Sequence, residues 1–324
     1  MIAVLKNYPG LGPVRQIHEL GNAGGFSGCL LWRIEREAGD LCLRRWSQEH
    51  PSQERLTMIH GVLAALVKSG LTFIPVPLLT RGGLTFLSHS SHFWELVPWM
   101  PGKADFHENP SRTRLANVME ATARIHQQAQ SFSPPLQQTS PTLLSRREQL
   151  QRLLHGGADQ LAAAVERHQD CELQSRGRQL LAHFRQRAST AMALLDALHS
   201  TPVPLFPVIR DLWHDHIFFT GDEVTGIVDF GAVRVDSVAC DLSRLLGSLV
   251  RNDRAAWEFA RQSYGSIRPL SADEWKLTQA LDAANVLLAG LNWLDWICIQ
   301  GRKFENLAVI HARLDEILSQ LAGA

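Results

Sequence analysis

The chain has 324 residues, enough for two domains or lobes that each bury a core. Its 32 basic and 32 acidic side chains cancel to a formal net charge of zero, which excludes the basic surplus typical of nucleic-acid-binding proteins. The most apolar late segment, residues 286–299, is interrupted by Asn292 and Asp295 and is too short to span a bilayer, so no membrane partner is expected. The first nine residues contain no apolar leader, and the five cysteines form no C-x-x-C pair. We therefore expect reduced thiols and a cytoplasmic location.

The first hundred residues have the pattern of a small β-rich lobe with one helix. Alternation predicts strands, glycine pairs predict turns, and apolar residues three and four positions apart predict a helix. In chain order we expect a glycine-rich turn at 21–28, strands at 29–34 and 41–46, a helix at 54–67, a hairpin turning at 82–83, and a last strand at 93–99.

Beyond Gly102 the pattern becomes mainly helical. In chain order we expect an amphipathic helix at 114–128, a surface loop at 131–141, a long helical region at 145–199, a strand-rich insert at 208–229 with a hairpin turn at 221–222, and helices from 241 onward. The sequence thus predicts an α+β fold of two lobes, with a β-rich lobe over residues 1–101 and a mainly α-helical lobe over 102–324.

The most informative motif is an Arg-Asp at Arg210-Asp211, followed by an Asp-Phe-Gly that begins at Asp229. This is the spacing of a kinase catalytic loop, H-R-D-L-x-x-x-N, and its metal-binding D-F-G, with Ile209 and His216 in place of the first His and the closing Asn. Asp211 would accept or orient the acceptor's proton as the catalytic residue, and His216 and Asp229 would be the metal ligands. Two protein ligands are enough for Mg²⁺, because the ion keeps several bound waters and fills its other positions with oxygens of the substrate phosphates.

Other interpretations of these residues stay open. Asp211 and Asp229 could be turn or capping residues. The imidazole of His216 favours Mn²⁺ or Zn²⁺ over Mg²⁺, or it could hold the loop by hydrogen bonds without touching metal. His214 and Asp215, next to His216, also permit a metal-dependent hydrolase centre.

A nucleotide site is predicted in the β-rich lobe. Glycines let backbone N–H groups approach an anion closely, so the turn at 21–28 would cover the phosphates, although a plain hairpin loop has the same pattern. Alternation puts Cys42 and Arg44 on one face of their strand, with Cys42 against adenine and Arg44 at the phosphates in the place of the kinase Lys. Arg44 could instead be a solvated charge at a strand edge. The residues of the turn expected to contact nucleotide are Gly24, Gly25, Phe26 and Ser27.

Together these residues resemble the aminoglycoside phosphotransferase and choline kinase-like group of the protein-kinase-like fold. Residues 209–219 correspond to the family's H-G-D-x-H-x-x-N-x-L-F, and residues 227–231 to its hydrophobic-I-D-W/F-G. Residues 97–102 resemble its hinge. The resemblance implies that Pro98, Trp99 and Met100 bind adenine, through the Pro98 carbonyl and the Met100 N–H. It also implies that Asp241 braces the catalytic loop, and the same Asp241 would serve as an N-cap.

The chain departs from the family at two further positions. The helix Glu that pairs with the strand Lys falls on His60, so the charge pair of Arg44 is either rebuilt with Glu54 or lost. The second loop His of the family is Trp213 here.

Three functions follow from these patterns. The first is an ATP-dependent phosphotransferase, a small-molecule kinase that acts on a hydroxyl of a sugar, amine or amino alcohol with Mg²⁺ or Mn²⁺. The second is a degenerate, nucleotide-binding pseudokinase, which the substitutions at Arg44, His60 and His216 favour. The third is the metal-dependent hydrolase. The acceptor and the oligomeric state are not readable from the sequence.

Overall fold

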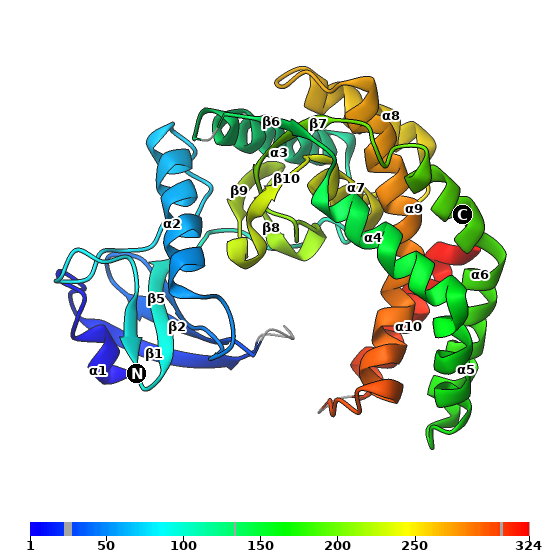
Figure 1. The fold of residues 1–324 in the computed structure, drawn as a ribbon. Helices are drawn as coiled ribbons and strands as arrows, with labels where there is room; N and C mark the ends of the chain where they lie inside the picture. Colours follow the sequence, from blue (N-terminus) through cyan, green and yellow to red (C-terminus); the bar gives the residue numbers. More distant parts are fainter. Residues whose placement is uncertain (23–27, 133, 305–306, 324) are drawn as a thin grey trace. The chain divides into compact units, whose positions relative to one another are not determined.

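The computed structural model describes residues 1–22, 28–132, 134–304 and 307–323, with elements labelled in Figure 1. The chain divides into two compact units, one formed by residues 1–133 and 214–233, the other by residues 134–213 and 234–324. Compared with the lobe boundary expected at residue 101, the first unit also includes α3 (Arg112–Phe132) and the segment 214–233. In the described parts of the chain, no helix combines the length and apolar character needed to cross a membrane.

The first unit contains a five-stranded antiparallel sheet in the order β1-β2-β3-β5-β4. Residues alternate between its faces, so that Leu41 and Leu43 of β3 are buried with Trp32 and Leu96 in a core that α1 (Ile2–Leu5) also joins. The opposite face of β3 carries Cys42 and Arg44, which are only partly buried. The strands are β1 (Val14–Gly21), β2 (Leu30–Arg36), β3 (Leu41–Arg45), β4 (Leu87–His89) and β5 (His92–Pro98).

Helix α2 (Gln53–Lys68) begins where the Ser52 side chain accepts a hydrogen bond from the Arg55 N–H, an ordinary N-cap. Its bounds match the predicted helix closely, because the apolar spacing there is regular. The predicted hairpin turn at residues 82–83 is wrong: the β4–β5 hairpin turns at residues 90–91, where both serines have positive φ. Residues 80–84 form a separate tight turn, closed by a hydrogen bond from the Thr80 N–H to the Leu84 carbonyl at 2.8 Å.

A second hairpin, β8 (Ile217–Thr220) and β9 (Glu223–Ile227), completes the first unit, with its turn at the predicted residues 221–222. Short 3-10 helices precede and follow it, η2 (His214–His216) and η3 (Phe230–Ala232). Lys103 and Phe219 exchange backbone hydrogen bonds of 3.0 and 2.9 Å, so the linker after β5 pairs with β8. Gly102 has φ +96°, and a Cβ there would overlap the Phe219 carbonyl. The hairpin is therefore fixed to the strand that carries the expected adenine hinge.

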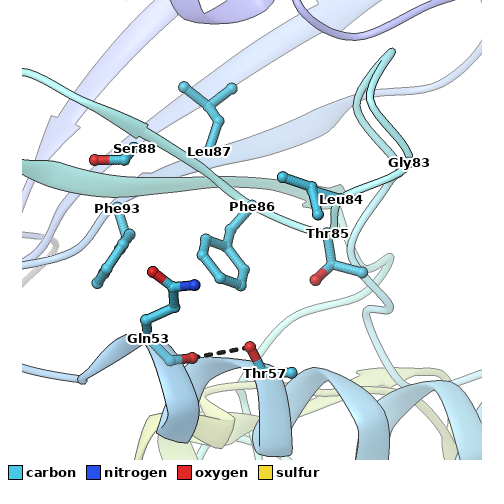
Figure 2. A pocket seen from close by; sticks show the side chains of 9 residues that line it. All are labelled: Gln53, Thr57, Gly83, Leu84, Thr85, Phe86, Leu87, Ser88 and Phe93. Carbon is cyan, nitrogen blue, oxygen red and sulfur yellow. Dashed lines mark hydrogen bonds between the residues drawn. The ribbon is translucent and has the colours of Figure 1, made fainter.

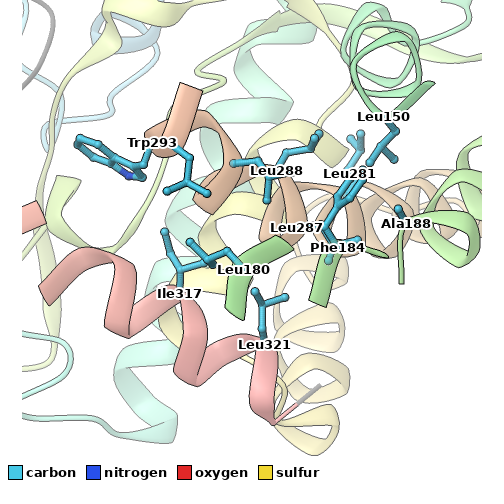
Figure 3. Packing of buried hydrophobic residues seen from close by; sticks show 14 of the residues in the cluster. Leu150, Leu180, Phe184, Ala188, Leu281, Leu287, Leu288, Trp293, Ile317 and Leu321 are labelled. Atoms are coloured by element: carbon cyan, nitrogen blue, oxygen red, sulfur yellow. The ribbon is translucent and has the colours of Figure 1, made fainter. Parts of the chain in front are cut away.

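The second unit is built around α6 and α9, whose apolar faces form its core with α4, α5 and α10 (Figure 3). Gly290 of α9 allows close packing, because a Cβ there would collide with Leu180 of α6. Helix α9 begins with a capping box between Ser271 and Glu274. The helices are α4 (Pro141–Arg152), α5 (Ala158–Glu166), α6 (Cys171–Asp196), α7 (Ala239–Leu249), α8 (Arg254–Gly265), α9 (Ala272–Leu294) and α10 (Leu307–Ala322), with π-helical turns η1 (Leu153–Gly157) and η4 (Asp295–Ile299).

The long helical region expected at 145–199 is present as α4, η1, α5 and α6, which are separated where Gly156 has φ +104° inside η1 and where Asp170 caps a new helix. The expected loop at 131–141 contains a short strand, β6 (Leu136–Gln138). It pairs with β7 (Val203–Val208), which in turn pairs with β10 (Arg234–Asp236). These strands lead into and away from the residues around Asp211.

Candidate active site

Arg44 lies between two carboxylates within the first unit. The β3–β5 register puts it directly opposite Glu95, and its Nε is 3.6 Å from Glu95 Oε1. Its NH1 is 3.3 Å from Asp229 Oδ1, and its guanidinium carbon stands 4.7 Å from the centre of the Trp46 ring. Burial alone would lower the pKa of Arg44, but Asp229 and Glu95 outweigh it and the pKa lies above the ordinary value. Arg44 is thus a largely buried, charged residue between two carboxylates and not a solvated residue at a strand edge.

Glu95, not Glu54, rebuilds the charge pair of Arg44. Its Oε2 is 2.7 Å from His60 Nε2, and His60 Nδ1 is 2.8 Å from the Thr85 hydroxyl. His60 occupies the position of the family's helix Glu and reaches Arg44 only through Glu95. Glu54 is exposed, and its carboxylate interacts with its own N-cap, Ser52. The sequence signal that was missed is the single acid inside the apolar run Phe93 to Val97.

We expect Glu95→Gln to lower the free energy of unfolding by about 3 kcal/mol, because it removes one side of a buried ion pair and leaves Arg44 under-compensated. Urea unfolding followed by tryptophan fluorescence measures this. The control is Glu37→Gln, which breaks an exposed pair with Arg15 whose atoms are 3.7 Å apart. This control substitution should lower the free energy of unfolding by less than about 1 kcal/mol. If the Glu95 variant is as stable as this control, the ion pairs of Arg44 do not stabilise the fold.

Asp229 and His216 are brought together by the β8–β9 hairpin. His216 ends η2 immediately before β8, Asp229 follows β9, and Ile217 pairs with Ile227 between them. The Val228 N–H donates to the His216 carbonyl at 3.0 Å. Asp229 has φ 62° and ψ 66°, a left-handed conformation that Asp tolerates better than most residues. Its Oδ2 then lies 3.8 Å from His216 Nε2, while its Oδ1 faces Arg44.

This donor set fits a divalent cation. Burial raises the pKa of Asp229, but Arg44 and then His216 outweigh it and hold the pKa below the ordinary value of 3.8, so the side chain is a carboxylate at neutral pH. Neighbouring ligands of an octahedral ion are about 3 Å apart, so a movement of less than about 1 Å would let both atoms bind one ion. One oxygen and one imidazole nitrogen suit Mn²⁺ as well as Mg²⁺.

The other residues expected at the nucleotide site lie on or next to the same strands. Cys42 is on the Arg44 face of β3, and burial raises the pKa of its thiol to about 11. The Trp99 N–H donates to the Asp40 carbonyl at 3.0 Å, so by alternation the Pro98 carbonyl and the Met100 N–H point away from β3. These are the two groups that the resemblance assigns to adenine. Gly24, Gly25, Phe26 and Ser27 fall outside the described residues.

Asp211 belongs to the second unit, in a loop held by buried carboxylates. Asp241 accepts from the Ile209 N–H at 2.8 Å and the Arg210 N–H at 2.5 Å. The N-cap of α7 is Val238, so the N-cap role considered for Asp241 is not observed, whereas the loop contacts are. Asp236 accepts from the Ser140 and Thr142 hydroxyls, both at 2.6 Å, and stands 3.7 Å from Arg210 Nε. Arg210 has φ +69°, a conformation that these bonds stabilise.

Basic and aromatic side chains surround Asp211 in the second unit. Arg244 Nε is 2.6 Å from Asp211 Oδ1. Trp213, at the place of the family's second loop His, packs against two cations: Arg313 at 4.4 Å and Arg244 at 5.7 Å from the ring centre. The motif predicts Asp211 and Trp213 in this loop, whereas Arg244 and Arg313 come from α7 and α10 and no sequence pattern connects them to it.

The geometry supports neither a metal-dependent hydrolase centre at residues 214–216 nor a nucleotide site in a separate cavity of the first unit. Among the residues that the structure describes, His214, Asp215 and His216 do not bring three ligand atoms together: His214 Nε2 is 3.2 Å from Asp215, while His216 faces Asp229. A separate cavity of about 300 Å³ lies between α2 and the chain before β5 (Figure 2). The described residues that line it carry no charge, so it lacks the groups a triphosphate needs. They are Gln53, Thr57, Gly83, Leu84, Thr85, Phe86, Leu87, Ser88 and Phe93.

This chain is similar to known proteins in sequence and in fold. Residues 20–275 match the profile of the phosphotransferase enzyme family, APH. A homoserine kinase from Brucella anthropi is 23% identical over 291 residues, which are 86% of this chain and 80% of the relative. The solved aminoglycoside phosphotransferase of Alicyclobacillus acidocaldarius superposes with a TM-score of 0.70 at 14% identity, covering 99% of this chain and 91% of its own. Spectinomycin phosphotransferase, solved in complex with ADP and spectinomycin, superposes with a TM-score of 0.65 at 11% identity, covering 95% of this chain and 93% of its own.

The fold and the family match define a small-molecule phosphotransferase of the protein-kinase-like class, a kinase in the broad sense. The predicted α+β fold class and the resemblance to the aminoglycoside phosphotransferase group are confirmed. The chain belongs to the phosphotransferase enzyme family.

Proposed function

We propose that this enzyme transfers the γ-phosphoryl group of ATP to a hydroxyl of a small molecule. The observation that carries the proposal is the Asp229 carboxylate, held with one oxygen toward Arg44 and the other toward His216 in the unit that also contains the hinge. The spectinomycin phosphotransferase complex with ADP supports ATP as the donor. A cytoplasmic location remains part of the proposal.

In this proposal the first unit binds the nucleotide. Pro98, Trp99 and Met100 hold the adenine edge, Cys42 packs on its face, and Gly24 to Ser27 contact the phosphates. Arg44 donates to the phosphates, because its planar fork can make two parallel hydrogen bonds to phosphate oxygens. His216 and Asp229 would hold Mg²⁺ or Mn²⁺, which when bound would neutralise charge on the β- and γ-phosphates.

Asp211 is the proposed catalytic residue. Its carboxylate would orient the acceptor hydroxyl and accept its proton as the oxygen attacks the γ-phosphorus. Asp241 positions it by fixing the N–H groups of Ile209 and Arg210. The acceptor would be a hydroxyl-bearing sugar, amine or amino alcohol. Homoserine, named for the Brucella relative, is a further hydroxyl compound to test.

One observation favours the alternative of a degenerate nucleotide-binding protein. The Arg44 guanidinium is 3.3 Å from Asp229 Oδ1 and therefore competes with a metal for this carboxylate. If the ion pair persists with nucleotide bound, Asp229 offers a metal only one oxygen, and binding without transfer would result.

We expect ATP with Mg²⁺ or Mn²⁺ to raise the melting temperature. At a nucleotide concentration of 100 times Kd, binding adds about 2.7 kcal/mol, which corresponds to a shift of about 5 °C for a chain of this size. Thermal-shift titrations with each metal and with EDTA measure it, and ADP release with a panel of hydroxyl compounds measures transfer. Absence of any shift contradicts nucleotide binding. A full shift with no transfer to any acceptor supports the degenerate protein instead.

A further inference from the structure

The second unit contains a group of arginines on the elements that surround Asp211. Arg244 of α7 contacts Asp211 directly, Arg210 precedes it, and Arg313 of α10 stacks on Trp213. Arg146 of α4 is connected to them by a hydrogen-bond chain: its Nε donates to Asn285 Oδ1 at 2.8 Å, and Asn285 Nδ2 donates at 3.4 Å to the hydroxyl of Ser243, the neighbour of Arg244.

Arg146 differs from the other arginines in its partners. Arg210, Arg244 and Arg313 each lie within 4.0 Å of a carboxylate: Asp236, Asp211 and Glu316 respectively. Arg146 donates to two amide oxygens, Asn285 Oδ1 and Gln149 Oε1, and the residues that the structure describes give it no carboxylate.

The electrostatic environment of Arg146 is unfavourable for its own charge. Burial lowers the pKa of its guanidinium, and the nearby charges of Arg210 and Arg244 lower it further, although Cys240 and Asp236 act in the opposite direction. Arg146 nevertheless remains partly accessible to solvent. An anion bound beside it would be attracted by several cations and would supply the missing counter-charge.

We propose that the acceptor carries an anionic group, a carboxylate or a phosphate, which Arg146 and Arg244 bind beside Asp211. This inference rests on the proposed phosphotransferase function and names the acceptor class of that site. An anion that draws Arg244 toward itself frees Asp211 Oδ1 for the acceptor hydroxyl. A polycationic acceptor would be repelled by the same arginines, so the enzyme selects small hydroxy acids or hydroxyl-bearing phosphate esters and rejects polyamines.

Calorimetric titration with two pairs of compounds, whose members differ in one anionic group, tests the proposal in the presence of Mg²⁺ and a non-hydrolysable ATP analogue. L-homoserine is compared with L-homoserine amide, and glycerol 3-phosphate with glycerol. In at least one pair, we expect the member that carries the carboxylate or phosphate to bind about tenfold or more tightly than the member that lacks it, which is the effect of one charge-assisted hydrogen bond. The pair that shows this difference distinguishes a carboxylate from a phosphate.

Arg146→Ala should weaken binding of the compound with the carboxylate or phosphate by about tenfold, and it should not weaken binding of the partner that lacks this group. Arg146→Lys should recover part of the affinity, since it keeps the charge but not the fork. The matched control is Arg147→Ala, one position along α4, whose guanidinium is paired with Asp196 at 2.5 Å. Its anion affinity should equal that of the unmodified protein.

Equal affinity for both members of both pairs, no binding by either anion, or an Arg146→Ala variant that retains full affinity would each overturn the proposal. Binding of the ATP analogue is measured in the same samples and reports on the proposed phosphotransferase function separately. If the analogue does not bind, that function fails, and the anion titrations without nucleotide still decide the role of Arg146.

Discussion

Replacing Asp211 by Asn should reduce the turnover of phosphoryl transfer by about 10²–10⁴-fold, the usual contribution of a positioned general base. Nucleotide binding should be retained, because Arg44, His216 and Asp229, the groups proposed to hold the phosphates and the metal, belong to the other unit. The Asp211–Arg244 ion pair is about two-fifths exposed on both sides, so its loss should cost less than about 1 kcal/mol of stability. A fall in turnover with unchanged stability is therefore the expected signature.

The matched control is Asp159→Asn, the same chemical change at an exposed ion pair in which Asp159 Oδ1 is 2.9 Å from Arg185. Its turnover should equal that of the unmodified enzyme. Single-turnover transfer and nucleotide titration separate the chemical step from binding. An Asp211→Asn variant with more than about a tenth of the original turnover would show that the proton leaves by another route.

Much of the fold could be predicted where apolar residues repeat with the spacing of a single type of secondary structure. Helix α2 was expected over residues 54–67 and spans 53–68, because its apolar residues keep helical spacing. The β8–β9 hairpin turns at Gly221-Asp222 as expected, since that pair suits a tight turn. In contrast, β6 has no alternation, and all three of its residues are exposed. It is a strand only because β7 offers it a pairing edge, which is tertiary information.

The candidate site, too, could be predicted only where local spacing determines the positions of its residues. The spacing of the motif predicted that His216 and Asp229 lie together, as they do, because local chain geometry determines where a hairpin presents its flanking side chains. The catalytic role of Asp211 and the metal ligation by His216 and Asp229 stay predictions. Glu95 could not be assigned as the partner of Arg44, since the two are 51 positions apart and meet only through the β3–β5 register. The arginines around Asp211 come from three helices and therefore depend on helix packing.

The second large effect is expected from Asp229→Asn, which should abolish the metal-dependent part of nucleotide binding and lower kcat/KM by about 10²–10³-fold or more. The amide removes the only carboxylate proposed to hold the metal and leaves Arg44 paired with Glu95 alone. Thermal-shift titrations with Mg²⁺, Mn²⁺ and EDTA measure the metal dependence. The control is Asp222→Asn in the turn of the same hairpin, where the carboxylate is exposed and 3.5 Å from Arg114 Nε.

The same variant should change the acid limb of the stability curve. Arg44 and His216 hold the pKa of Asp229 below its ordinary value of 3.8 in the fold, so the unfolded chain binds this proton more readily. The stabilisation is therefore complete above about pH 5 and is lost as the pH falls through the folded pKa. Asp229→Asn should be less stable at neutral pH and should show a shallower loss of stability below about pH 4. If its acid limb parallels that of the unmodified enzyme, the Arg44–Asp229 pair does not persist in solution, and a metal meets no competition for this carboxylate.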